Sequence, residues 1–149
     1  NCTVERVAMP TIEEIIEDFE FLDDWEDRYR YVIELGRTLE PRPDSDKNDL
    51  TKVQGCVSQV WLTDTVDGSD PADPVLHFKG DSDAHIVRGL VAIMLAASSG
   101  RKASEIIALD ESALFAKLGL IEHLTPQRAH GLRSMVARIK AEASAAADA

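Results

Sequence analysis

Two stretches in the first forty residues carry apolar side chains that recur every three or four positions. The first stretch, residues 11–22, predicts a helix with one apolar face and one acidic face. Thr11 follows a proline and precedes Glu14 by three residues, a spacing typical of a capping box. The second stretch, residues 24–39, predicts a helix with Asp23 or Asp24 as its N-cap. The acidic face of the first helix, a solvated surface that also suits attraction of a basic partner, contains Glu13, Glu14, Glu17 and Asp18.

The pattern then changes to that of a β-hairpin. Residues 53–65 are rich in Val, Thr and Trp, which favours a strand. Residues 67–71 read Asp-Gly-Ser-Asp-Pro, a composition typical of turns. Residues 75–79 alternate apolar and polar side chains and predict a second strand. We therefore expect an antiparallel hairpin with a longer connecting loop.

The second half of the chain predicts helices again. Residues 83–98 are apolar on nearly every side, which is typical of a helix at the centre of a core. Shorter helices are expected over 103–109 and 111–118, and Thr125-Pro126 begins a last helix with Thr as its N-cap. This order predicts an α+β fold, a small antiparallel sheet packed against several helices, in one domain of residues 1–149. Residues 1–10 are expected as an N-terminal tail and 142–149 as a frayed C-terminal end.

Composition and charge exclude several classes of function. The chain has 16 Lys and Arg against 27 Asp and Glu, a net charge of −11, so nucleic acid is not expected as a partner. The longest strongly apolar stretch, residues 86–97, contains Arg88 and is too short to span a bilayer, so no membrane partner is expected. Two cysteines and no visible secretory leader indicate a reducing compartment, and we expect a cytoplasmic protein. The four histidines show no metal-ligand spacing, and neither a metal nor a cofactor is expected.

Cys56 is the residue with the clearest chemical potential. It follows Gly55 at the boundary between a polar loop and the first predicted strand. Glycine there permits an unusual backbone and close approach of another chain, and loops on rigid sheets often hold reactive groups. The competing interpretation is that Cys56 is a small buried apolar residue. The position alone leaves these two interpretations equally open, and Cys2 receives no role.

Four ordered motifs resemble those of the SufE family, the sulfur-acceptor partners of cysteine desulfurases. The similarity extends over residues 11–141. Residues 55–61, Gly-Cys-Val-Ser-Gln-Val-Trp, are similar to the active-cysteine signature of the family. The other three motifs are residues 25–29 with 33–36, residues 80–84 with 86–90, and residues 123–126 with Arg128, Gly131 and Leu132. The resemblance implies the fold that this family shares with IscU-like proteins.

The resemblance also implies a function. A SufS-like, pyridoxal-phosphate-dependent cysteine desulfurase would donate persulfide sulfur to Cys56, and a SufBCD-like scaffold would receive it for iron–sulfur cluster assembly. The chain would then be an activator and sulfur carrier, not an independent enzyme, and a monomer or weak homodimer. The alternative within this class is a paralogous, CsdE-like protein that serves other acceptors. The residues expected to form the persulfide loop and bind the partner are Gln54, Gly55, Ser58, Asp81, Ser82, Asp83 and Arg128.

Several of these residues have a structural interpretation beside the functional one. Residues 81–83 most simply cap the following helix, but they lie near the cysteine loop in the family and would then restrain it. Arg128 either favours the Cys56 thiolate, because a nearby cation lowers a thiol pKa, or is a surface arginine. Gln54 and Gln59 either hydrogen-bond the loop or a partner, or are ordinary polar residues. Trp61 is expected in the core.

Two functions of other classes compete with sulfur transfer. A cysteine-nucleophile hydrolase would pair Cys56 with one of the four histidines, but the sequence favours no particular pairing. A cluster scaffold would need three or four thiolate or imidazole ligands, and only one cysteine lies in the body of the chain. In the sulfur-transfer hypothesis the loops 55–56 and 80–83 form the docking surface. Partner binding then requires the cysteine loop to move, because a sheltered thiol must enter another protein's pocket.

Overall fold

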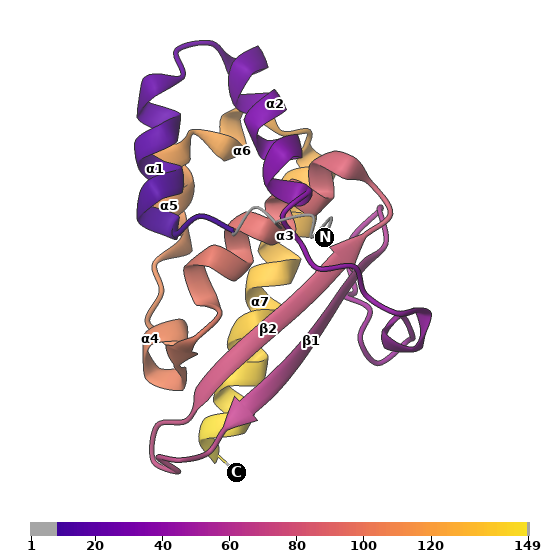
Figure 1. Ribbon diagram of the computed structural model, residues 1–149, viewed down its shortest axis with the longest axis vertical. Coiled ribbons are helices and arrows are strands. Elements are labelled where there is room, and N and C mark those ends of the chain that lie inside the picture. The colour runs from indigo at the N-terminus through magenta and orange to yellow at the C-terminus, as the bar shows by residue number, and fades with distance from the viewer. Residues whose placement is uncertain (1–8, 149) are drawn as a thin grey trace, which may run out of the picture.

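The computed structural model describes residues 9–148, and Cys2 lies outside the described residues. A small antiparallel sheet packs against several helices (Figure 1), which confirms the predicted α+β class. The strands are β1 (Val60–Asp67), β2 (Val75–Ser82) and β3 (Arg101–Lys102). The α-helices are α1 (Ile12–Phe21), α2 (Trp25–Gly36), α3 (His85–Ser98), α4 (Ala103–Ile107), α5 (Glu111–Leu118), α6 (Leu120–His123) and α7 (Pro126–Asp148), and Asp44–Asp46 form a 3-10 turn.

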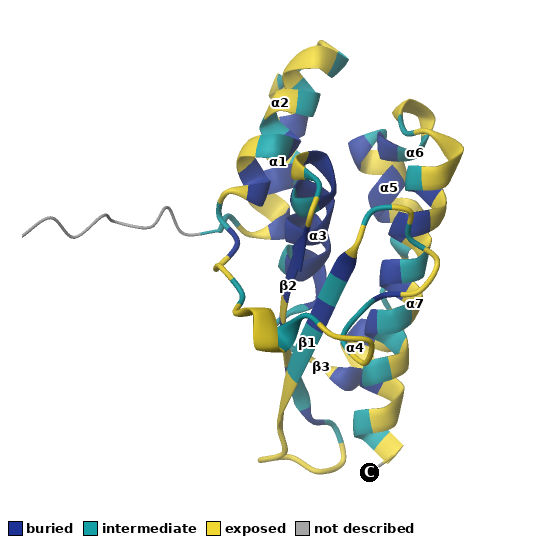
Figure 2. Ribbon diagram, turned by 90° about the vertical axis from the view of Figure 1, so that its right-hand side faces the viewer, coloured by how far each residue is buried: buried dark blue, intermediate teal, exposed yellow. Residues whose placement is uncertain are grey.

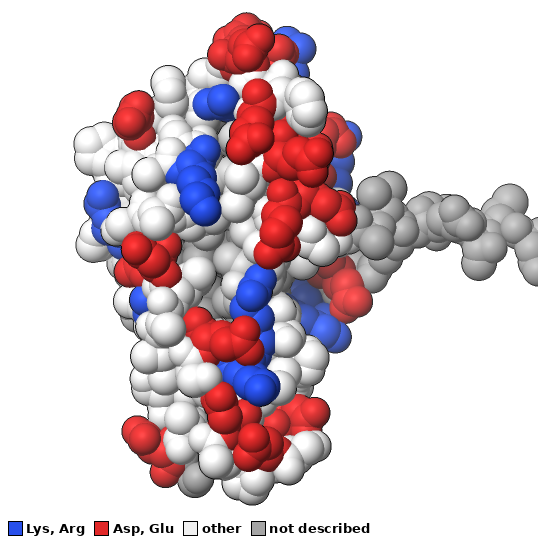
Figure 3. All heavy atoms as spheres, turned by 90° about the vertical axis from the view of Figure 1, so that its left-hand side faces the viewer, with Lys and Arg blue, Asp and Glu red and all other residues white. Residues whose placement is uncertain are grey.

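The first two helices begin where their polar caps predicted. The Thr11 hydroxyl accepts a hydrogen bond from the Glu14 amide at 3.2 Å, and the Asp24 carboxylate accepts one from the Glu26 amide at 3.0 Å. Arg28 of α2 reaches back and donates to the carbonyls of Leu22 (2.7 Å) and Phe19 (3.0 Å) at the end of α1. The Phe19 carbonyl also accepts from the Leu22 amide, so Arg28 adds a second donor at the end of α1, where the last carbonyls of a helix lack intrahelical donors. The exposed carboxylates of α1 produce the acidic face seen in Figure 3.

The predicted hairpin is present, but its first strand begins later than the sequence indicated. β1 and β2 pair in antiparallel register from Val60 opposite Ser82 to Asp67 opposite Val75. Residues 54–59, which the sequence placed in the strand, form a loop instead. Gly55 has φ +90°, a conformation incompatible with a regular strand. The short strand β3 extends the sheet beyond β2 and was not predicted.

Helix α3 lies at the centre of the core, as its apolar composition predicted. Eleven of its fourteen residues are buried, and it contacts α2, β2 and α7. Figure 2 shows this helix as an almost continuously buried segment. Its crossing with α2 is close, because a Cβ atom added to Gly89 would lie 2.0 Å from the Val32 carbonyl oxygen. The core therefore depends on a glycine at this crossing.

Helix α7 differs from its prediction at the C-terminal end. The sequence predicted fraying over 142–149, yet α7 remains helical to Asp148. Ala143 is fully buried, and Ala146 and Ala147 pack against the core. The Ala-rich segment therefore has apolar surface to bury, which the sequence pattern did not reveal.

Within residues 9–148, no helix combines the length and apolar character needed to cross a bilayer.

Candidate functional site

A short ladder closes the loop that contains Cys56. The Val53 amide donates to the Val60 carbonyl, and the Leu62 amide donates to the Thr51 carbonyl, both at 2.8 Å. The two ends of the loop formed by residues 54–59 therefore lie side by side. Gln54 and Gly55 are exposed, and a Cβ atom at Gly55 would lie 2.6 Å from the Ser134 hydroxyl oxygen of α7. Both its positive φ and its close approach to α7 require glycine at this position.

The Cys56 thiol is half-buried against the backbone of α7. Its Sγ donates to the Gly131 carbonyl oxygen at 3.5 Å, and a Cβ atom on Gly131 would lie 3.4 Å from the sulfur. Burial raises the pKa of the Cys56 thiol above its usual value. A hydrogen bond from the thiol to a carbonyl also favours the protonated form. In this position Cys56 is therefore a neutral thiol and a poor nucleophile.

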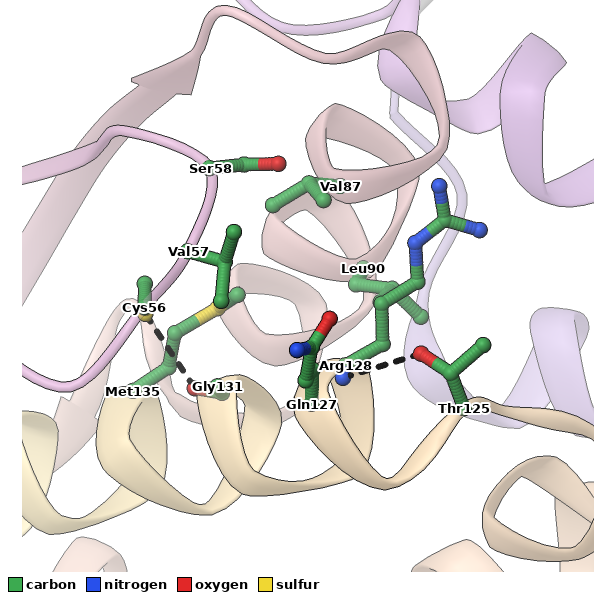
Figure 4. A pocket seen from close by; sticks show the side chains of 10 residues that line it. All are labelled: Cys56, Val57, Ser58, Val87, Leu90, Thr125, Gln127, Arg128, Gly131 and Met135. Atoms are coloured by element: carbon green, nitrogen blue, oxygen red, sulfur yellow. Dashed lines mark hydrogen bonds between the residues drawn. The ribbon is translucent and has the colours of Figure 1, made fainter.

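The thiol opens into a pocket between its own loop, α3 and the start of α7 (Figure 4). The pocket has a volume of about 280 Å³. Apolar and polar side chains share its wall, and Ser58 and Arg128 are the two predicted site residues that line it beside Cys56. The remaining lining residues are Val57, Val87, Leu90, Thr125, Gln127, Gly131 and Met135.

Arg128 lines this pocket without approaching the sulfur. Its guanidinium points away from Cys56, toward the opposite end of the pocket (Figure 4). Its backbone amide donates to the Thr125 hydroxyl at 3.2 Å, which confirms Thr125 as the cap of α7. Because the pKa of Cys56 is raised by burial and not lowered by a cation, the structure does not support Arg128 as the group that favours the thiolate here.

Ser82 and Asp83 restrain the downstream end of the cysteine loop through Gln59. The Ser82 hydroxyl donates to the Gln59 carbonyl at 2.7 Å, and the Gln59 amide donates to the Asp83 carboxylate at 3.0 Å. The prediction that residues 81–83 cap the next helix is wrong, because the N-cap of α3 is Ala84 and no side chain caps it. Ser82 and Asp83 contact the loop instead, as the alternative that the sequence had left open would require.

Asp81 forms ion pairs with two basic residues for which the sequence predicted no role. Its carboxylate, in a residue only 8% exposed, pairs with Lys47 at 3.2 Å and with Arg88 at 3.0 Å. Lys47 also lies over the Trp61 ring, 5.1 Å from its centroid. The prediction of Trp61 as a core residue is wrong, because Trp61 is only partly buried. Asp81 thus anchors the segment before the cysteine loop to α3.

One face of α7 supplies the remaining contacts to the loop. This face carries four residues at helical spacing: Gly131, Ser134, Met135 and Arg138. Each lies against the loop, its pocket, or the paired residues 51–53 and 60–62 that form the stem of the loop. Arg138 donates to the carbonyls of Leu50 at 2.6 Å and Lys52 at 3.2 Å. The helical spacing of these residues was the only signal in the sequence. Because they are a mixture of small, polar and charged types, a search for hydrophobic periodicity does not find them.

A scan of family models then identifies the chain. The model described as "SufE: Fe-S metabolism associated domain" matches residues 13–143, almost the whole described chain. The chain belongs to the SufE family. Membership connects it with iron–sulfur metabolism, in agreement with the resemblance carried by the four motifs.

Individual SufE-like relatives agree with the family match. The chain is 57% identical over 145 residues to an uncharacterized SufE-like protein of Rhizobium etli, covering 97% of each chain. It is 60% identical over 135 residues to an uncharacterized SufE-like protein of Rhizobium meliloti, covering 91% of this chain and 96% of that protein. The solution structure of a hypothetical protein from Thermus thermophilus has the same fold, with a TM-score of 0.73 and 19% identity, covering 96% of this chain and all of the other.

The two competing functions receive no support from the SufE-family site. No histidine is among the residues that line the pocket of Cys56. His123, for example, stacks on Trp25 with ring centroids 4.2 Å apart. Over residues 9–148, no group of three or more His, Cys, Asp or Glu side chains is arranged to hold a metal ion. His130 lies nearer, since a Cβ atom on Gly55 would be 3.3 Å from its Nε2, but the hydrogen bond of the Cys56 thiol goes to the Gly131 carbonyl. The described residues therefore offer no metal-cluster site, and the observed bond of Cys56 does not favour a Cys–His nucleophile.

We expect a carboxylate pair on β1 and α7 to make the stability of this protein depend on pH. Asp64 of β1 hydrogen-bonds Glu142 of α7, and its pKa is raised by burial first and by Glu142 second, while Arg138 lowers it. A raised pKa in the folded state favours folding at low pH, and this contribution is lost as the pH rises through the raised pKa. Asp64→Asn, which cannot ionise, should therefore raise the melting temperature at neutral pH but not in acid.

Thermal unfolding followed against pH tests this expectation. Asp67→Asn is the matched control on the same strand, because Asp67 is fully exposed and its pKa is lowered by bonds from Ser69. The control should bring no gain in melting temperature at neutral pH. Equal gains in both variants would show that the Asp64–Glu142 pair is not the cause.

Proposed function

We propose that this protein accepts persulfide sulfur on Cys56 from a SufS-like cysteine desulfurase and passes it to a SufBCD-like scaffold for cluster assembly. The proposal rests on one observation: the motif cysteine of a SufE-family chain sits half-buried on a short loop, tethered at both ends, beside a partly apolar pocket. Such a loop can hold a reactive sulfur out of bulk solvent and still present it to a partner. A chain that carries sulfur in this way activates a desulfurase and is not an independent enzyme.

The transfer step is an exchange between a thiolate and a persulfide. The Cys56 thiolate attacks the outer sulfur of the donor's persulfide and forms a new S–S bond. The S–S bond of the donor breaks, and its cysteine leaves as a thiolate with the bonding electron pair. The proton released by Cys56 balances the one taken up by the donor thiolate, so the step needs no external oxidant or reductant. A second exchange of the same kind passes the sulfur to the acceptor.

The position of Cys56 in the free protein favours an unreactive thiol. A neutral thiol bonded to the Gly131 carbonyl reacts slowly, because the thiolate is the nucleophile. The thiol becomes reactive when the loop leaves α7 and the burial that raises its pKa is relieved. We infer that partner docking on the loop residues 55–56 and on the exposed Asp83 beside them drives this displacement, because Gly80, Asp81 and Ser82, the rest of the predicted docking surface, are buried at the end of β2. Val57, a loop side chain that is 77% exposed, offers apolar contact to the partner.

The remaining features of the sulfur-carrier function are part of the same proposal. Gln54 and Gly55, both exposed at the tip of the loop, would contact the partner directly. We expect the chain to act in the cytoplasm as a monomer or weak homodimer. A CsdE-like route, in which the same Cys56 chemistry serves other acceptors, is the alternative assignment of the pathway.

Mass spectrometry tests the proposal directly. After incubation with a cysteine desulfurase and cysteine, the peptide that contains Cys56 should gain the mass of one sulfur atom. The gain should disappear on treatment with a thiol reductant and should not occur when the desulfurase is omitted. A digest separates this peptide from the one that contains Cys2. Sulfur found on Cys2 alone, or on neither cysteine, would overturn the proposed function.

A further inference from the structure

The two ends of the cysteine loop are tethered by different parts of the fold. At the downstream end, Ser82 and Asp83 hold Gln59. At the upstream end, the stem residues 51–53 pair with residues 60–62 of β1 through the Val53 and Leu62 amides, each of which donates at 2.8 Å. Arg138 of α7 adds a second tether from the opposite side by donating to the Leu50 and Lys52 carbonyls. A hydrogen bond from a charged donor is stronger than one between neutral groups, so this contact is substantial.

We propose that Arg138 is the positioning residue for Cys56, fixing the upstream end of the loop so that only residues 54–58 leave α7 when the thiol is presented. The inference rests on the proposed function and goes beyond it, since Arg138 belongs to none of the motifs that carry the family resemblance. Arg138 touches no reacting atom. It acts through the backbone on either side of Thr51, next to the hinge of the loop at Val53.

Glu142 holds the Arg138 side chain in the geometry that this role requires. Its carboxylate accepts from Arg138 Nε at 3.0 Å, one helical turn further along α7. The two terminal nitrogens remain directed at the carbonyls of Leu50 and Lys52, 3.2 Å or less away. The planar guanidinium therefore bonds three groups at once, and a lysine ammonium at the same place would reproduce only part of this arrangement.

Fixed hinges limit how far Cys56 travels. Cys56 lies three residues from Val53 and three from Gln59. A fully extended chain covers about 3.3–3.6 Å per residue, so the Cys56 backbone stays within about 11 Å of both hinges. A donor must therefore bring its persulfide close to the stem of the loop. Without Arg138 the upstream hinge would move toward Leu50, and the thiol would sample a wider volume.

The test compares Arg138→Ala, Arg138→Lys and the control Arg133→Ala. Arg133 is exposed on the same helix but lines a separate pocket with residues of α5 and α6. The rate at which iodoacetamide alkylates Cys56 reports how often the loop opens. We expect Arg138→Ala to increase this rate about tenfold, Arg138→Lys to restore part of the protection, and Arg133→Ala to match the wild type.

Amide hydrogen exchange locates the effect within the loop. In Arg138→Ala, the Val53 and Leu62 amides of the stem should exchange faster, while the Gln59 amide, held by Asp83, should keep its protection. Unchanged alkylation and unchanged exchange at Val53 would overturn the proposal. Faster exchange at Gln59 as well, together with a matching loss of melting temperature, would also overturn it, since Arg138 would then serve only overall stability. Neither measurement involves a desulfurase, so these failures are distinguishable from failure of the proposed function.

Discussion

Cys56→Ser should abolish sulfur acceptance while the protein remains folded. A serine hydroxyl is a far weaker nucleophile than a thiolate, and without a sulfur atom it cannot form the S–S bond that carries the transferred atom. Sulfur transferred from labelled cysteine in the presence of a desulfurase should fall by at least about a hundredfold, to the background without carrier. The fold should survive, because a hydroxyl occupies less space than a thiol and also donates to the Gly131 carbonyl that Cys56 contacts. Circular dichroism and the melting temperature check this second point.

The natural control for this variant is Cys2→Ser. Cys2 has no role in the proposed function, so its replacement should leave sulfur acceptance unchanged. If Cys56→Ser still stimulates a cognate desulfurase without added reductant, the protein does not act as a sulfur carrier through Cys56. The combination of a silent Cys2 and an essential Cys56 would identify the reactive thiol unambiguously.

Gly89→Ala should cause the largest loss of stability of any glycine-to-alanine change in this chain, because its added Cβ makes the shortest contact of any glycine. The new Cβ would lie 2.0 Å from the Val32 carbonyl oxygen and 2.6 Å from its carbonyl carbon, both backbone atoms that no rotamer change can move. Alanine gains about 1 kcal/mol of helix propensity over glycine. Separating α2 from α3 to relieve the clash costs more, since overpacking a core costs typically 1–3 kcal/mol and occasionally more. We expect the free energy of unfolding to fall by about 3 kcal/mol or more.

Equilibrium denaturation with guanidinium chloride measures this loss. The matched control is Gly68→Ala, because no atom lies within 4 Å of the Cβ it would add. Its effect should stay within about 0.5 kcal/mol, as for most surface substitutions. Similar denaturation midpoints for the two variants would mean that the α2–α3 crossing tolerates separation. Because α3 also borders the cysteine pocket through Val87 and Leu90, Gly89→Ala should also make Cys56 more accessible to alkylation.

The helices were predictable because the signals that specify them are local. Thr11, Asp24 and Thr125 each cap the next turn with a side chain, and the apolar composition of residues 86–95 required burial wherever that helix lies. The start of β1 was not predictable in the same way. Val53 and Val57 favour a strand, but the positive φ of Gly55 and the contacts of Gln59 with Ser82 and Asp83 at the end of β2 turn this segment into a loop. Intrinsic strand propensity is weak enough for such contacts to override it.

The sequence by itself determined the family, the α+β class and the one cysteine on which the proposed chemistry depends. Only the tertiary structure decided the state of that cysteine and what holds its loop. Cys56 bonds a carbonyl 75 residues away, and Arg138 bonds carbonyls 86 and 88 residues away. Each of these acceptors is a backbone oxygen, a group that every residue has. The amino-acid pattern therefore carries no mark of such contacts, and they exist only once packing of α7 against the sheet brings the chain segments together.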